Sequence, residues 1–195
     1  MHKVTVVTSG KGGVGKTTVV ANLGAGLAMA GYQTLLIDMD LGLRNLDIVL
    51  GLESRVIYTI LDVLQGRCRM KQALVRDKRY TNLYLLAAAQ SADKDAIEPE
   101  QIVKLITILR EDFDYILLDC PAGIEKGFRN SLVAADDAIV VVNPEVSSIR
   151  DADRVIGLLD AGGIRERALV INRLRSDLMK ELNHRYKGHD VQDAS

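Results

Sequence analysis

The sequence predicts an α/β fold, a mainly parallel, twisted sheet with helices on both faces. Six short apolar runs punctuate the chain, and they do not alternate apolar with polar residues, as is typical of strands buried on both faces. Helical patterns separate most of these runs, which indicates repeated βαβ units with right-handed crossovers. The expected strands are residues 4–7, 34–37, 83–87, 115–118, 138–142 and 168–171.

Length and composition favour one domain over residues 1–195. The formal net charge is −1, so no bulk field attracts nucleic acid. The two cysteines, Cys68 and Cys120, form no C-x-x-C pair, which argues against a disulfide framework or a zinc site. No signal peptide and no apolar run near the ~20 residues of a spanning helix is evident. A soluble, cytoplasmic protein is expected.

A glycine-rich stretch, S-G-K-G-G-V-G-K-T-T, joins the first strand to an expected helix over residues 17–30. Its part from Gly10 to Thr17 fits the P-loop pattern G-x-x-x-x-G-K-[ST]. Glycines let successive backbone N–H groups converge on phosphate oxygens at the positive end of a helix. The expected nucleotide-phosphate site consists of Gly10, Lys11, Gly12, Gly13, Val14, Gly15, Lys16, Thr17 and Thr18.

Within this site, Lys16 would bring a cation to the β- and γ-phosphates, and the Thr17 hydroxyl suits Mg²⁺. The strand 115–118 ends in Asp119, the Walker B arrangement, in which the carboxylate holds Mg²⁺ directly or through water. Gly123 can place a backbone N–H beside the γ-phosphate and move when that phosphate leaves. Cys120 is interpreted as an inert neighbour.

The second expected strand also delivers carboxylates, Asp38 and Asp40, to the carboxyl ends of the strands. Ligands of open α/β sheets bind at that edge, so both should lie near the P-loop. The alternative is that they cap the next element. After the last strand, the Asn172 amide could pair with an adenine edge and Arg173 could stack on the ring. The guanine-reading N-K-x-D is absent, so ATP is favoured.

Two later helices are expected. Pro99 fits a first helical turn and is followed by an apolar stripe; Ser148 resembles the start of a capping box with Asp151. The stripes are Ile102, Leu105, Ile106 and Leu109 in the first helix and Ile149, Ala152, Ile156 and Leu159 in the second. Residues 58–79 predict short helices, with basic residues that suit a solvated face better than an anionic docking surface. A further helix is predicted over 178–186.

Several motifs resemble the MinD/ParA family of ATPases. K-G-G-V-G-K-T-T at 11–18 resembles its deviant Walker A motif, and D-M-D at 38–40 and D-C-P-A-G at 119–123 resemble its two switch regions. L-G-L-R-N-L-D at 41–47 and N-P-E-V-S-S-I-R-D-A-D-R at 143–154 resemble the MinD branch more specifically. The resemblance runs from residue 1 to about Asn172.

The resemblance implies a P-loop NTPase of the SIMIBI type that uses ATP and Mg²⁺ and forms a homodimer in the ATP state. Lys11 would reach across the dimer to the partner's nucleotide. Asp40 would help position the attacking water, and Asp38 would support the Mg²⁺ site. By the same resemblance, Asn45, Arg150 and Asp151 would lie at contacts with the second copy or with a partner.

In the family, such proteins place the division septum. The implied partners are a MinC-like inhibitor of FtsZ assembly and a MinE-like activator, without which hydrolysis should be slow. The family's C-terminal portion, with a helix that attaches to the inner face of the membrane, is expected to be missing from residues 1–195.

Three alternatives stay open. A ParA-type or flagellar-number positioning ATPase is one, although DNA partition would need a basic surface. A metabolic enzyme on the same scaffold is another; a reductase would need cluster-ligating cysteines, and a ligase would need a carboxylate-bearing substrate pocket. The third is a truncated nucleotide-binding module without septum activity.

Overall fold

The computed structural model describes residues 2–90, 97–123 and 126–174, and the expected helix at 178–186 lies outside them. Its centre is a seven-stranded sheet in the order β3-β4-β2-β5-β1-β6-β7. Six of the strands are parallel, which confirms the predicted fold class. They are β1 (Lys3–Thr8), β2 (Thr34–Asp38), β4 (Leu83–Leu86), β5 (Tyr115–Asp119), β6 (Asp137–Val142) and β7 (Arg167–Ile171).

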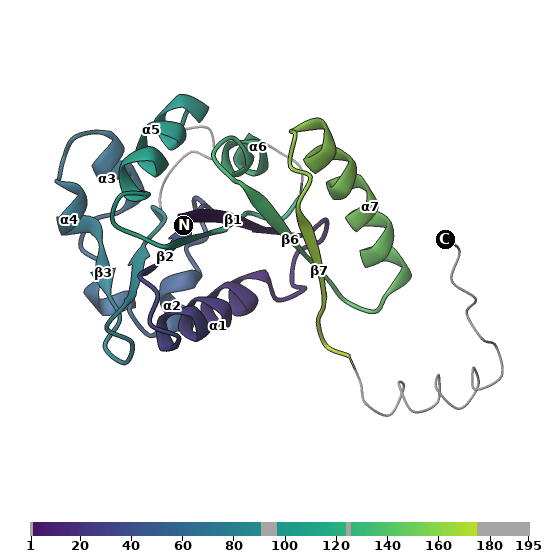
Figure 1. The fold of residues 1–195 in the computed structure, drawn as a ribbon, viewed down its shortest axis with the longest axis horizontal. Helices are drawn as coiled ribbons and strands as arrows, with labels where there is room; N and C mark the ends of the chain where they lie inside the picture. Colours follow the sequence, from purple (N-terminus) through teal and green to yellow (C-terminus); the bar gives the residue numbers. More distant parts are fainter. Residues whose placement is uncertain (1, 91–96, 124–125, 175–195) are drawn as a thin grey trace.

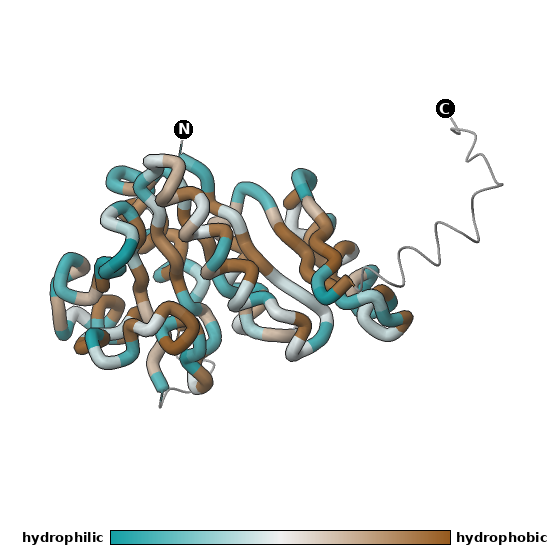
Figure 2. The backbone as a smooth tube through the Cα atoms, turned by 90° about the horizontal axis from the view of Figure 1, so that it is seen from below, coloured by the Kyte–Doolittle hydropathy of each residue, from teal (hydrophilic) through white to brown (hydrophobic). Residues whose placement is uncertain are grey.

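Helices cover both faces of the sheet (Figure 1). On one face lie α5 (Pro99–Leu109), α6 (Lys126–Leu132) and α7 (Val146–Ala161), and on the other α1 (Lys16–Met29) and α2 (Leu46–Leu50). Alternate residues of β1 enter different cores: Val4 and Val6 pack beneath α5–α7, whereas Val7 packs beneath α1. Figure 2 shows apolar, brown segments through the middle of the molecule and hydrophilic, teal ones at most of its outer turns. No helix in the described ranges is long and apolar enough to cross a membrane.

The segment 58–79 forms short helices as predicted, with one addition. Within it, α3 (Ile60–Leu64) and α4 (Met70–Ala73) are followed by β3 (Val75–Arg76), which pairs antiparallel with β4, and the short helix η1 (Glu53–Arg55) precedes the segment. The prediction missed β3 because two residues carry no periodicity and their pairing depends on a strand elsewhere in the chain.

The helix that begins at Pro99 has its whole predicted stripe buried, but the prediction for α7 was partly wrong. α7 begins at Val146, and Ser148 lies inside it, where its Oγ accepts the Asn143 N–H at 3.1 Å. Ser148 therefore lies on the inward side of the helix, whereas Ile149 is 53% exposed. The buried stripe is therefore Ser148, Ala152, Val155 and Leu159.

Helix α1 lies close to the sheet because of a small residue. A Cβ added at Gly24 would lie 2.5 Å from Leu36 Cδ2, so this glycine lets the helix that follows the P-loop approach β2. Val20 and Gly24 are buried, whereas Leu23 and Leu27 are only partly covered.

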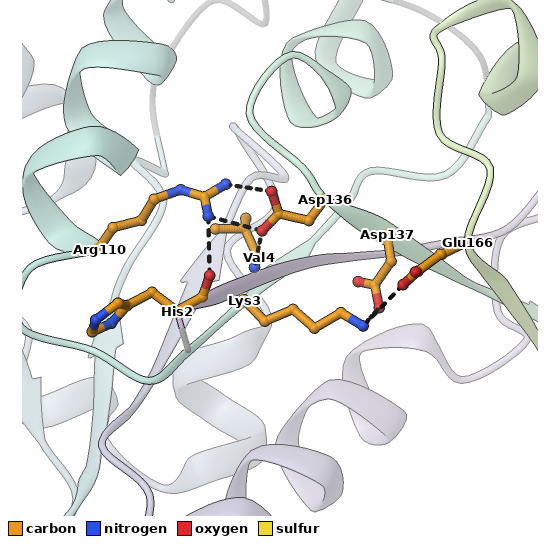
Figure 3. Close-up of polar contacts among 7 residues, drawn as sticks. All are labelled: His2, Lys3, Val4, Arg110, Asp136, Asp137 and Glu166. Carbon is orange, nitrogen blue, oxygen red and sulfur yellow. Dashed lines mark hydrogen bonds and ion pairs between the residues drawn. The ribbon is translucent and has the colours of Figure 1, made fainter.

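Ion pairs fasten the amino ends of the strands, opposite the P-loop (Figure 3). Arg110 at the end of α5 donates from Nη1 and Nη2 to both carboxylate oxygens of Asp136, each at 2.8 Å, and the Val4 N–H donates to the same carboxylate at 2.8 Å. Lys3 Nζ lies 2.9 Å from Asp137 and 3.2 Å from Glu166. These contacts join β1 to α5 and to the starts of β6 and β7.

Candidate nucleotide site

The P-loop leaves the carboxyl end of β1 and turns into α1. Gly13 has φ +75° and Gly15 has φ +100°, a region that residues with a Cβ seldom adopt. The Ser9 hydroxyl donates to the Lys11 carbonyl at 2.7 Å, which closes the loop at its start. Lys16, the first residue of α1, is only 9% exposed. The predicted loop thus has the backbone that cradles phosphate at a helix N-terminus.

Two remote segments pack against this loop. A Cβ at Gly10 would lie 2.5 Å from the backbone carbonyl carbon and the Cβ of Asp151, so α7 leaves no room for a side chain there. On the other side, Asn172 Nδ2 donates to the Val14 carbonyl at 2.8 Å, and it occupies the space where a Cβ of Gly15 would lie. The P-loop, α7 and the end of β7 therefore meet at one place.

Two predicted carboxylates sit side by side behind the P-loop. Asp38 and Asp119 are register partners at the ends of β2 and β5, and they are 1% and 3% exposed. Burial raises the pKa of Asp119 to about 7; the charge of Asp38 adds to this rise, and a hydrogen bond with Thr17 and the Lys16 charge oppose it. Burial also raises the pKa of Asp38 to about 6, although hydrogen bonds from several backbone N–H groups act to lower it.

Asp38 holds the loop that follows it. Its carboxylate accepts the N–H groups of Asp40 at 2.9 Å and of Asn45 and Leu46 at 3.1 Å each. Asp38 thus makes the contacts of the capping alternative, because these N–H groups belong to the N-cap residue and the first residue of α2, and its predicted support of the Mg²⁺ site stays a prediction. Asp40 is half-buried, and its charge acts on both Asp38 and Asp119.

The residues present fit Mg²⁺ with a nucleotide. Asp119 Oδ1 is buried and has no hydrogen-bond partner within the described part of the chain, and Thr17 lies beside the same carboxylate. A hydroxyl and a carboxylate oxygen are ligands that Mg²⁺ accepts, usually together with substrate phosphates and water. No group of three or more His, Cys, Asp or Glu residues that could hold a metal ion occurs in the described ranges, so phosphate oxygens would have to complete the shell.

The second switch segment also touches the P-loop. Gly123 has φ +93°, and its N–H donates to the Ser9 carbonyl at 3.4 Å. Cys120 is 1% exposed, and burial raises the pKa of its thiol to about 12. A thiol in this state is not a nucleophile at neutral pH, which agrees with the interpretation from sequence.

Lys11 has partners that sequence reasoning missed. Its Nζ lies 3.2 Å from Glu145 Oε2 and 3.5 Å from Ser147 Oγ, at the start of α7. Segment 143–154 was identified from the sequence as a family motif, but nothing in its residues indicated a contact with a lysine more than 130 positions away. Asn45 and Arg150 are exposed, and Arg173 is exposed with φ +57°. Their predicted roles stay predictions.

A P-loop beside buried carboxylates at the ends of two neighbouring parallel strands defines a P-loop ATPase of the MinD/ParA fold. A family model described as an AAA domain matches residues 2–161. The putative septum site-determining protein MinD of Guillardia theta is 59% identical over 180 residues, which are 92% of this chain and 67% of that protein. The chain belongs to the MinD family of cell-division ATPases.

Two solved structures extend this comparison. MinD in the MinC:MinD cell division protein complex of Aquifex aeolicus aligns with a TM-score of 0.84 at 52% identity, covering 92% of this chain and 72% of that one. MinD of Pyrococcus horikoshii, complexed with Mg-ADP, aligns with a TM-score of 0.81 at 31% identity, covering 93% and 77%.

Proposed function

We propose that this chain is an ATP- and Mg²⁺-dependent dimerising switch that acts in placing the division septum. The observation that carries the proposal is the buried Oδ1 of Asp119 beside Thr17, which has no hydrogen-bond partner among the described residues and lies next to a P-loop with glycines at positive φ. A buried carboxylate oxygen without a partner is costly unless a cation or donor completes it. The Mg-ADP complex of the Pyrococcus horikoshii relative supports the same ligands here.

In this proposal, each residue has a separate task in ATP hydrolysis. Lys16 and the P-loop N–H groups hold the β- and γ-phosphates, and Thr17 and Asp119 hold Mg²⁺, which would neutralise charge on the phosphate oxygens. Asp40 orients the attacking water. The Gly123 N–H exchanges its bond to Ser9 for one to the γ-phosphate, so loss of that phosphate would release the segment.

Dimerisation would use Lys11. Its cation is bonded to Glu145 at the surface, with side chains 46% and 56% exposed, so the pair is weak and the lysine could give it up for a phosphate. Asn45, Arg150 and Asp151 would lie at the dimer or partner surface. Asn172 and Arg173 would line the adenine side, which would require Asn172 to share or leave its bond to Val14.

The proposed partners follow from the relatives. MinC accompanies MinD in the Aquifex aeolicus complex, so a MinC-type inhibitor is the proposed binding partner. A MinE-type activator would raise a hydrolysis rate that is otherwise of order 10⁻⁴ to 10⁻² per second, as in comparable unassisted switches. Attachment to the inner face of the membrane, as the resemblance to the family implies, is a further part of this proposal.

Size-exclusion chromatography with light scattering tests the switch. The chain is run with Mg²⁺ and either ADP or a non-hydrolysable ATP analogue. A dimer with the analogue and a monomer with ADP is the expected result. A monomer in both states would reduce the function to nucleotide binding, and salt-sensitive DNA binding by the ATP form would favour a partition ATPase instead.

A further inference from the structure

Arg44 adopts a backbone conformation that its side chain disfavours. Its φ is +41°, and the only other residue with a Cβ and positive φ in the described ranges is Arg173. Such conformations persist where the surroundings hold them, and they concentrate in switch regions and binding sites. Arg44 lies in the loop between Asp40 and α2, so the contacts that hold it also bear on Asp40.

The Arg44 side chain is held by a buried carboxylate. Its Nε lies 2.6 Å from Asp47 Oδ2, its Nη2 lies 2.5 Å from the same oxygen, and Nη2 also donates to the Glu53 carbonyl at 3.3 Å. The side chains of Arg44 and Asp47 are 12% and 1% exposed. Asp47 Oδ1 has no partner among the described residues, so the Arg44 guanidinium is the cation that offsets the cost of burying the Asp47 carboxylate.

The backbone of the same residue is bonded to Asp40. The N–H groups of Leu43 and Arg44 both donate to the Asp40 carbonyl, at 3.3 and 3.2 Å. Asp38 grips the two ends of this turn through the N–H groups of Asp40 and Asn45. A left-handed Arg44 is therefore part of the turn that sets the direction of Asp40.

The ion pair connects this turn to the P-loop helix. Asp47 belongs to the first turn of α2, and α2 packs against α1, which begins at Lys16. We propose that Arg44 is a positioning residue, whose pairing with Asp47 locks the turn 40–46 onto α2 and so holds Asp40 at the site. This rests on the proposed ATPase function. In this proposal Arg44 does not contact the phosphates of the nucleotide.

Three variants separate this role from general stability. Arg44→Gly removes the guanidinium but suits a positive φ, Arg44→Lys keeps a charge without the two-nitrogen contact, and Asp47→Asn removes the charge of the acceptor. Arg55→Ala is the matched control, because Arg55 also bonds a carbonyl, that of Arg76 at 2.6 Å, but lies outside the turn. The double variant of Arg44→Gly and Asp47→Asn completes a cycle.

Two readouts decide the matter. Amide hydrogen exchange of the nucleotide-free chain should accelerate about tenfold or more at residues 43–46 in the three variants, and not in the sheet or in Arg55→Ala. Single-turnover hydrolysis should slow about ten- to a hundredfold, with the Kd for a fluorescent ATP analogue within about twofold of wild type. The double variant should be no slower than either single one.

Other outcomes overturn the inference. Wild-type hydrolysis and unchanged exchange in Arg44→Gly would show that the guanidinium is not needed. An equal loss of affinity, hydrolysis and protection throughout the sheet would reveal a merely structural pair. If the wild-type chain hydrolyses no ATP, the proposed function fails by itself, and the exchange pattern alone still confirms or refutes the lock on the turn.

Discussion

Lys11 Nζ and Glu145 Oε2 lie 3.2 Å apart and join the P-loop to the residue that precedes α7. Because both side chains are about half exposed, the pair contributes roughly 0 to 1 kcal/mol. Lys11→Ala should therefore leave the free energy of unfolding within about 1 kcal/mol of wild type while it abolishes the dimer. Light scattering with the ATP analogue checks this, and a normal dimer would refute the role of Lys11. Glu145→Gln is the control, since it removes the charge from the partner of Lys11 but keeps the lysine.

Thr17→Ala should weaken nucleotide binding only when Mg²⁺ is present. The hydroxyl lies beside the Asp119 carboxylate, so its loss removes one proposed ligand and a hydrogen bond from the same site. An affinity loss of about tenfold or more is expected by titration calorimetry with Mg²⁺, and little change with a chelator. Thr17→Ser keeps the hydroxyl and should bind nearly as wild type. Equal affinity of the alanine variant under both conditions would exclude the Mg²⁺ role.

Gly10→Ala should destabilise the fold through α7. The new Cβ would lie 2.5 Å from Asp151 backbone atoms, which cannot move aside as a flexible side-chain end can. A loss of about 1 to 3 kcal/mol is expected from urea unfolding. Gly26→Ala is the matched control, because nothing lies within 4 Å of a Cβ added there and the site is inside α1. That change should be neutral or stabilise by up to about 1 kcal/mol, and equal effects at both sites would contradict the packing argument.

Arg110→Met should flatten the acid limb of the stability curve. Partial burial acts to raise the pKa of Asp136, but Arg110 and the Val4 N–H outweigh it and hold that pKa below its ordinary value (Figure 3). A lowered carboxylate pKa stabilises the fold above the unfolded value near 3.9, and this contribution disappears as the pH falls below it.

The wild-type advantage over Arg110→Met should therefore be largest at neutral pH and shrink below about pH 4. Its pH-dependent part should stay near 1 kcal/mol, because the side chains are 30% and 41% exposed and solvent screens the pair. Urea titrations from pH 3 to pH 7 measure it. A difference independent of pH would assign the whole effect to the bonds that Arg110 makes to the His2 and Ala134 carbonyls.

Leu169→Lys should reduce self-association of the chain. Leu169 is 56% exposed on β7, which is an edge strand of the sheet among the described residues, and long apolar edges pair with other chains. The opposite edge is only two residues long and carries Arg76, as protected edges do. Dynamic light scattering at rising concentration should show less aggregate. Ile57→Lys, which removes an even more exposed apolar side chain outside the sheet, should help less; equal benefit would point to general hydrophobicity.

Much of the site could be read from local pattern. Two apolar runs end in Asp38 and Asp119, and glycines precede Lys16 at fixed spacing. These patterns involve only residues that are neighbours in sequence, so they are visible without the folded structure. Because parallel strands share one carboxyl edge, these residues had to converge once the fold class was known. Pro99 and the stripe that follows it were equally local.

The remaining features needed the folded chain. That Glu145 faces Lys11, that Asp151 fills the space above Gly10 and that Asn172 bonds the P-loop all depend on the strand order, which places β6 beside β1 and β7 beside β6. The inward side of α7 includes Ser148, which accepts the Asn143 N–H from outside the helix, a contact that the apolar pattern of the helix does not reveal. Residues far apart in sequence leave no periodic trace of their contact, because that contact is set by packing of whole elements and by the cost of unpaired buried polar groups.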